Sequence, residues 1–225
     1  MSIDTSPCRT EQELIERYGA VGLEKQMVLY SFIGQQPWHI NAEGSHIIFG
    51  NSLICPIQVI GTYIPDSQAW LYAWANDGIR FPSLVLSHAR QLKEYGEKYQ
   101  NDFLRYHGFQ ANQADVHKLG LIASGMFQAS GYFLANLSDV VLLLTLYNAQ
   151  IPNRIKDDLG AIPDVFPAIC NLYPMNQYKA FVQYLIAKGI AYTQTEDTVV
   201  ATKNDATIVG KFDQSGRMLH LEAKI

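Results

Sequence analysis

The chain has 225 residues, which is enough for one large domain or two small ones, and 17% of them are charged while 12% are aromatic. Its net charge of -4 and its lack of a Lys/Arg run argue against nucleic-acid binding. Residues 1–10 do not resemble a secretory signal, and the most apolar window is too short to span a membrane. The three cysteines lie far apart, which argues against a disulfide framework. We therefore expect a cytoplasmic protein.

The first third of the chain predicts one helix followed by antiparallel strands. A capping-box pattern at Thr10 precedes apolar residues at helical spacing, which predicts a helix to about Ser31. Turn residues then separate four strand-like runs, so we expect an antiparallel meander at 36–41, 46–49, 53–64 and 70–76. The helix is expected to pack on this meander through Leu14, Tyr18, Val21 and Phe32.

The middle of the chain predicts two helices and two strands. Pro82 is suited to a first helical turn, and the helix after it should carry Leu84, His88, Leu92, Tyr95 and Tyr99 on one face. Another helix, rich in small residues, is predicted over 112–130. Strands are predicted at 132–135 and 140–147, the second of them central because both of its faces are apolar.

The last third predicts a long loop, a helix and a second meander. Residues 151–174 are rich in Pro, Asn and Asp, which is typical of a linker or a surface loop. A helix over 176–188 ends at Gly189. Three strands are expected near 191–201, 207–213 and 218–224, with Leu219, Leu221 and Ala223 facing inward.

These elements predict an α+β fold in which antiparallel meander sheets pack against about four helices. A single composite domain over residues 1–225 is our first prediction. The alternative is a helix, meander and helix domain over 1–150, followed by a C-terminal unit over 175–225 made of a helix and three strands.

The sequence carries no specific catalytic, metal or cofactor motif. The P-loop, the dinucleotide-binding glycines, the zinc-protease pattern and the Ca²⁺ loop are all missing, and no two histidines share a helix face at a spacing of four. Cys55 and Cys170 lie in apolar segments, which favours small buried hydrophobic residues over nucleophiles. We therefore predict no cofactor, no metal and no catalytic residue.

The alternating aromatic run at 70–76 is the best candidate site. On a strand, Trp70, Tyr72 and Trp74 share one face with Asn76 in line behind them. One interpretation is a layer of the core. The other is an aromatic cleft in which Asn76 contacts a ligand or a partner peptide. Trp70 is expected to be core, and Trp74, nearer the strand end, to be a wall of the cleft.

Several short motifs resemble a family of uncharacterised bacterial proteins, a domain of unknown function with a W-x-W-A-N hallmark strand. The motifs are Trp-His-Ile-Asn at 38–41 before a Gly turn and Phe49, Gly-Thr-Tyr at 61–63 leading into 70–76, Leu-Lys-Glu-Tyr-Gly at 92–96 and, more weakly, the 212–217 hairpin. Tyr72 stands where the family often has another Trp. The resemblance implies a bacterial cytoplasmic protein and no known activity, cofactor or catalytic residue.

Two functions follow as hypotheses. The first is a non-enzymatic binding or interaction protein whose partner, an unidentified protein or a small apolar ligand, contacts the aromatic cleft. The second is an enzyme, most plausibly a hydrolase, whose groups come from distant loops; two titratable groups within hydrogen-bond reach in a deep pocket would favour it. The large share of apolar residues also fits a homo-oligomer interface. Neither nucleic acid nor a membrane is expected as a partner.

Overall fold

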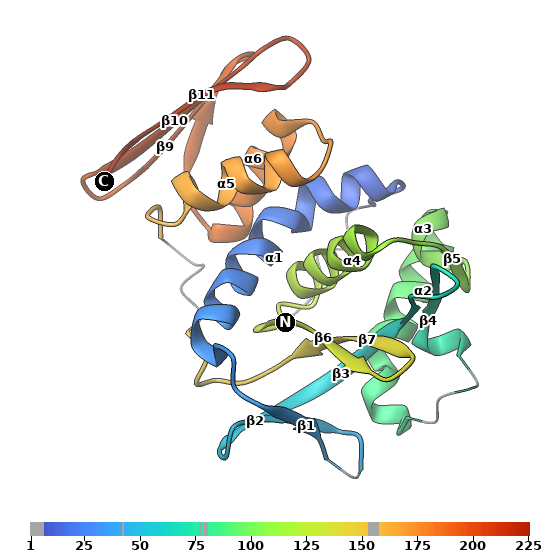
Figure 1. Ribbon diagram of the computed structural model, residues 1–225. Helices are drawn as coiled ribbons and strands as arrows, with labels where there is room; N and C mark the ends of the chain where they lie inside the picture. The colour runs from blue at the N-terminus through green and yellow to red at the C-terminus, as the bar shows by residue number, and fades with distance from the viewer. Residues whose placement is uncertain (1–6, 42, 77, 79–80, 153–157) are drawn as a thin grey trace.

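The computed structural model describes residues 7–41, 43–76, 78, 81–152 and 158–225. Within these residues the chain forms a large and a small antiparallel sheet (Figure 1). The large sheet contains β1 (Trp38–Ile40), β2 (His46–Phe49), β3 (Leu53–Ile64), β4 (Ala69–Tyr72), β5 (Gly108–Gln110), β6 (Gly131–Leu137) and β7 (Val140–Leu146). The small sheet contains β8 (Tyr192–Gln194), β9 (Thr198–Lys203), β10 (Ala206–Phe212) and β11 (Met218–Lys224).

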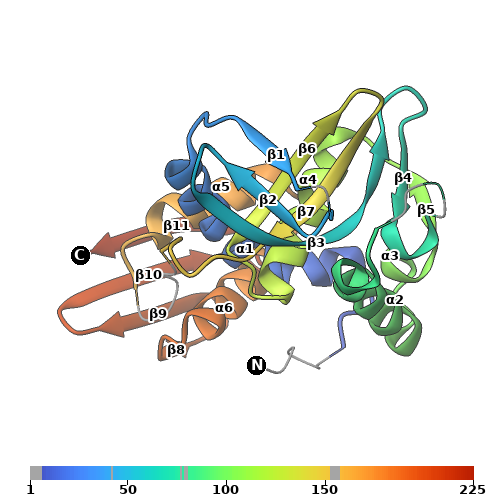
Figure 2. The ribbon, with the colours of Figure 1, turned by 90° about the horizontal axis from the view of Figure 1, so that it is seen from below.

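Strand β3 connects the parts of the large sheet. Its first residues pair with β2, its last residues pair with β4, and its middle pairs with β7, which lies between β3 and β6. Figure 2 shows this long strand curving along the sheet. The predicted meander of β1 to β4 and the central position of β7 are both confirmed.

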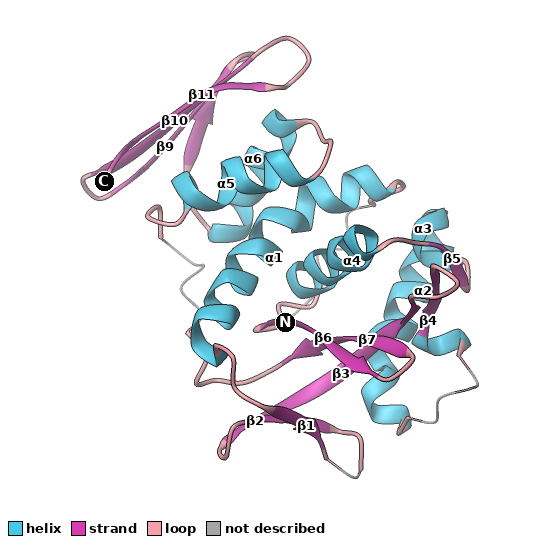
Figure 3. Cartoon of the chain, viewed as in Figure 1, coloured by secondary structure: helices cyan, strands magenta, loops and turns pink. Residues whose placement is uncertain are grey.

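Several helices lie between the two sheets, and others lie beside the large sheet, as Figure 3 shows. The longer ones are α1 (Glu11–Ile33), α2 (Ser87–Tyr99), α4 (Gln113–Met126), α5 (Ile162–Leu172) and α6 (Gln177–Lys188). The shorter elements are α3 (Asp102–Arg105) and the 3₁₀ helices η1 (Ala73–Ala75) and η2 (Ser83–Leu86). Together with the antiparallel sheets, they confirm the predicted α+β fold class. No helix of the described part of the chain is long and apolar enough to cross a membrane.

Helix α1 begins as predicted, but it packs differently from the prediction. Thr10 caps the helix and forms a capping box with Glu13. Leu14, Tyr18 and Val21 pack into a core shared with α4, α5 and α6 instead of covering the first meander. The meander is contacted by the last turns of α1, and Phe32 is 39% exposed. The error arose because an amphipathic pattern identifies a buried face but does not identify the element that covers it.

The aromatic run is a shorter strand than predicted. β4 ends at Tyr72, and residues 73–75 turn into the 3₁₀ helix η1. The strict alternation of the sequence therefore does not continue to Trp74, which lies outside the sheet. Trp70 packs over Gly61 of β3, where a Cβ would lie 2.4 Å from the Trp70 ring. Only glycine leaves room for the indole at that position.

Two predicted segments have a different structure. Residues 151–174 are not a continuous loop, because α5 occupies 162–172 and has Pro163 in its first turn and Pro167 inside it. The apolar residues Ile162, Val165, Phe166 and Ile169 have helical spacing and are buried, so their packing outweighs the cost of Pro167. The helix after Pro82 begins as η2, and this leaves Leu84 exposed instead of on the buried face.

The small sheet has four strands in the order β11-β10-β9-β8, one more than predicted. The predicted inward face of the last strand is wrong, because Leu219 and Ala223 are exposed. The register of β10 against β11 shifts between Lys211 and Phe212 and skips Leu219. A β-bulge at this point turns the following side chains away from the face that alternation predicts.

Candidate functional site

The aromatic residues of the candidate site separate into two environments. Trp70 and Tyr72 are fully buried, and their rings pack edge to face with centroids 5.6 Å apart. The Tyr72 hydroxyl donates to the Phe103 carbonyl at 2.7 Å. Both side chains belong to the core, as we expected for Trp70, and neither is accessible to a ligand.

Trp74 and Asn76 lie closer to the surface. Trp74 is half-buried between the Tyr72 ring, stacked at 6.1 Å, and the Lys93 ammonium, 4.8 Å from the indole centroid. Asn76 donates to Thr62 Oγ1 at 3.2 Å and accepts from the Gly78 amide at 3.1 Å. The Asn76 amide thus links its own turn to β3, and Trp74 is the residue of this set whose ring remains accessible.

The middle of α1 carries three consecutive polar residues that are all buried: Glu24, Lys25 and Gln26. Gln26 bridges to the backbone of Tyr132 in β6, donating to its carbonyl at 2.9 Å and accepting from its amide at 2.8 Å. Glu24 and Lys25 point in different directions and line different cavities. Buried charges require nearby compensation, so the surroundings of these two residues are informative.

Glu24 forms a buried cluster with α6. Lys188 donates to both carboxylate oxygens at 2.7 and 2.8 Å, and the Tyr184 hydroxyl donates to Oε2 at 2.5 Å. The Lys188 side chain is fully buried, and burial together with the Glu24 charge raises the pKa of Tyr184 well above its usual value. The three groups satisfy one another and join α1 to α6. Although they are within hydrogen-bond reach, Tyr184 and Lys188 are closed to solvent.

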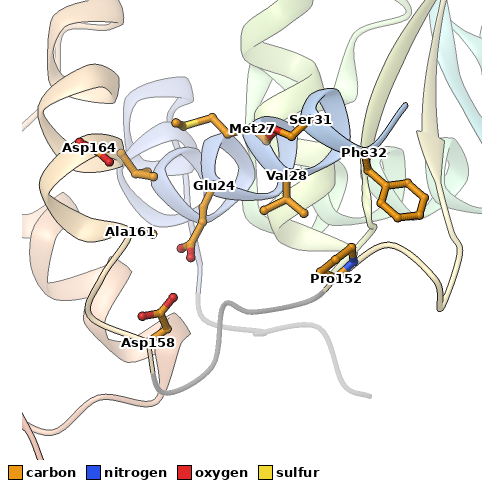
Figure 4. A pocket seen from close by; sticks show the side chains of 10 residues that line it. Glu24, Met27, Val28, Ser31, Phe32, Pro152, Asp158, Ala161 and Asp164 are labelled. Atoms are coloured by element: carbon orange, nitrogen blue, oxygen red, sulfur yellow. The ribbon is translucent and has the colours of Figure 1, made fainter. Parts of the chain in front are cut away.

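A groove of about 420 Å³ lies between α1 and α5, and we call it the α1–α5 groove. Figure 4 shows Glu24 and Asp158 pointing into the same space, with Phe32 and Pro152 at the other end. The groove is lined by Glu24, Met27, Val28, Ser31, Phe32, Pro152, Asp158, Ala161, Asp164 and Val165. It joins an apolar surface of α1 to a carboxylate-rich end. Residues 153–157, between two of its lining residues, lie outside the described residues.

A second, more polar cavity of about 310 Å³ is lined by Lys25, the residue after Glu24 on α1, and we call it the Lys25 pocket. It is lined by Lys25, Gln128, Ala129, Ser130, Tyr147, Asn148, Ala149, Ile151 and Pro152. The Lys25 ammonium donates to the Ala129 carbonyl at 2.7 Å. Burial lowers the pKa of Lys25 to about 8, and the Glu24 charge opposes this change.

Tyr147 connects the Lys25 pocket to a partly buried histidine. The Tyr147 hydroxyl lies 2.9 Å from His88 Nδ1, and the His88 ring stacks on Phe127 with centroids 4.0 Å apart. Burial lowers the pKa of His88 to about 4 and raises that of Tyr147 to about 12. Both side chains are therefore uncharged near neutral pH.

Cys55 is buried and Cys170 packs partly buried against the core, as their apolar sequence context predicted. Cys55 and Cys170 form no disulfide, and burial raises the thiol pKa of Cys55 to about 11 and of Cys170 to about 12. A thiol with a raised pKa carries little of the nucleophilic thiolate. Among the described residues, no three His, Cys, Asp or Glu side chains form a cluster suited to a metal ion.

The comparisons identify a family whose function is unknown. A family of unknown function (DUF6882) matches residues 12–146. The chain belongs to this family. A search of curated proteins found no match, and a search of solved structures found none either. The DUF6882 region runs from α1 to the end of β7, so the wall of the α1–α5 groove formed by α1 lies inside it, and the lining residues Pro152 and those within 158–165 lie outside it.

Sequence reasoning missed both cavities of this DUF6882 protein. The run Glu24-Lys25-Gln26 gave no clear signal, because three consecutive residues span only about 200° of a helix and can all lie on its solvent face. Their partners, Lys188 and the Ala129 carbonyl, come from distant elements. Pairing over such separations depends on the tertiary fold, which helical spacing alone does not encode.

Proposed function

We propose that this protein is a non-enzymatic binding protein whose protein partner contacts the α1–α5 groove. The observation that supports the proposal is the combination, in one groove, of exposed apolar side chains and carboxylates. Met27 is 42% exposed and Phe32 39% exposed on the last turns of α1. Exposed apolar residues next to a polar rim are typical of protein-interaction surfaces.

The charge of the groove favours a basic partner. Lys188 compensates Glu24, whereas Asp158 and Asp164 have no ion-pair partner within the described residues. A partner segment with alternating apolar and basic side chains would fill the apolar end and place its cations near the two aspartates. The partner is thus defined by chemistry, as a short basic and apolar segment of a protein in the cytoplasm of a bacterium.

Trp74 offers a second contact surface for the same class of function. Its half-exposed ring, with Lys93 above it, is the part of the predicted aromatic cleft that a partner can reach. An aromatic ring at an accessible position is a frequent anchor in interfaces. We keep Trp74 and Asn76 as proposed contact residues, secondary to the groove.

The test uses two labelled peptides, one of alternating Leu and Lys and one of alternating Leu and Glu, with binding measured by fluorescence anisotropy. The full chain should bind the Leu/Lys peptide and not the Leu/Glu peptide. Asp164→Lys should weaken binding by about five- to tenfold, because it reverses one accessible charge. Met27→Ser should weaken it through lost apolar contact.

Glu97→Lys is the matched control, since Glu97 is an exposed helical carboxylate on α2, away from the groove. Equal weakening by Asp164→Lys and Glu97→Lys would show only attraction to the net charge and would contradict the proposal. A concentration-dependent mass in light scattering, without peptide, would assign the groove to a second copy of the chain instead.

A hydrolase is the second candidate, favoured by the contact of Glu24 with Tyr184 and Lys188 beside a groove. In that case the folded chain should hydrolyse a simple activated ester, and Glu24→Gln should abolish the activity while the protein remains folded. Activity that survives Glu24→Gln would remove these residues from the reaction.

A further inference from the structure

We propose that the Lys25 pocket binds a small monocarboxylate, with the Lys25 ammonium as its counter-charge. This site is distinct from the α1–α5 groove, with which it shares only Pro152. An experiment on this pocket therefore gives a result that is independent of the partner proposed for the groove.

The hydrogen bonding of Lys25 is incomplete. An ammonium has three donors, and the Ala129 carbonyl accepts one of them at 2.7 Å. Glu24, the adjacent carboxylate, is held by Lys188 and Tyr184 on another side of α1. Only 6% of the Lys25 residue is exposed, yet it lines the cavity, so the remaining donors have the pocket as their available space. An anion in the pocket would accept hydrogen bonds from these remaining donors.

The lining selects the chemical class of the anion. The pocket contributes one cationic side chain, which matches one negative charge better than the two charges of a phosphate. Ala129, Ala149 and Ile151 provide apolar walls for a short carbon chain. The exposed Gln128 side chain lies at the rim, where its amide can donate to the second carboxylate oxygen. A short aliphatic carboxylate fits these groups and the volume of about 310 Å³.

The pH dependence follows from the charge of Lys25. Two titratable groups of the described residues lie near Lys25: the charge of Glu24 acts on it from the preceding position of the helix, and Tyr147 lines the same pocket. Tyr147 stays neutral because burial raises its pKa to about 12. With the Lys25 pKa lowered to about 8 in the free protein, carboxylate binding should weaken above that pH. Between neutral pH and about pH 9.5, the affinity should fall by roughly tenfold or more as the ammonium deprotonates.

The test titrates the full-length protein with propionate by calorimetry, using sodium chloride at equal ionic strength as the reference. The wild type should bind with the stated pH dependence, and Lys25→Met should not bind. Lys179→Met, at an exposed position on α6, is the matched control and should bind like the wild type. Binding that persists in Lys25→Met, or that does not change between pH 7 and pH 9.5, would overturn the proposal.

A second measurement needs no variant. Cyanate carbamylates neutral amines, and mass spectrometry of the digested wild-type protein reads each lysine separately. Propionate should slow the carbamylation of Lys25 several-fold and leave that of exposed Lys224 unchanged. Equal rates at Lys25 with and without propionate would exclude occupation of the pocket.

Discussion

At the scale of single residues, the two tryptophans of the aromatic run should differ in their effect on stability. Trp70 is fully buried over Gly61, whereas Trp74 is half-buried. Trp70→Ala should reduce the free energy of unfolding by about 3–5 kcal/mol, because it removes a large apolar side chain and leaves a cavity. Trp74→Ala should cost only about 1–2 kcal/mol. Thermal melts measure the difference, and acrylamide should quench Trp74 more than Trp70. Equal, severe losses would place both residues in the core.

The buried ion pair makes a second residue-scale prediction. Lys188→Met leaves the Glu24 carboxylate buried without its cation and should cost about 3–5 kcal/mol of unfolding free energy in urea titrations. The double variant Glu24→Gln with Lys188→Met removes both charges and keeps the hydrogen bond from Tyr184. It should be more stable than Lys188→Met alone. Additive losses in the double variant would show that the two charges do not stabilise each other.

His88 predicts a loss of stability in mild acid. Its pKa in the folded protein is lowered to about 4 by burial, below the value of about 6.5 for an unfolded histidine. Between these values the unfolded chain binds a proton that the folded chain does not, so stability is complete above about pH 6.5 and falls as pH decreases toward 4. After allowance for its partial solvent exposure, the loss at pH 5 is about 1 kcal/mol. Urea unfolding of His88→Asn should lack this part of the pH dependence; an identical loss in the variant would assign it to other groups.

At the scale of elements, the crossing of α1 and α4 depends on glycine. A Cβ on Gly22 would lie 2.2 Å from the Leu121 carbonyl oxygen, so Gly22→Ala must push the helices apart. We expect a loss of about 2–3 kcal/mol in unfolding free energy, despite the higher helix propensity of alanine. In the same helix, a Cβ on Gly19 would be close only to the flexible end of the Ile15 side chain and would make an ordinary van der Waals contact with Ile169. Gly19→Ala should change stability by less than about 1 kcal/mol. A mild Gly22→Ala variant would contradict the close crossing.

Sequence patterns predicted the elements whose signals are local. Thr10 with Glu13 marked the start of α1, Gly189 marked the end of α6, and turn residues between strand-like runs marked β1 to β4, because caps and turns depend on neighbouring residues. α5 was missed because the Pro, Asn and Asp residues of 151–174 suggested a loop. The site was predicted less well than the fold: Trp70 is core as expected, but Tyr72 of the candidate cleft is core too, and the two cavities along α1 depend on contacts between distant segments.

At the scale of the whole molecule, α1 links the family region to the C-terminal part. It packs on α4, α5 and α6, and its Glu24 is paired with Lys188 of α6. We therefore propose that residues 1–225 unfold as one unit. A fragment of residues 1–150 would expose the apolar face of α1 and leave Glu24 without its cation, so it should aggregate or lose its cooperative thermal transition. A soluble fragment with a sharp melting transition would favour the two-domain alternative.

The central proposal is that the α1–α5 groove receives a basic and apolar segment, and hydrogen exchange measured by mass spectrometry tests it most directly. With the Leu/Lys peptide bound, amides of residues 24–32 and 158–165, which line the two walls of the groove, should exchange more slowly than in the free protein. The rest of the described chain should be unchanged. Slower exchange around Trp74 instead, or no change in either wall of the groove, would contradict the proposal.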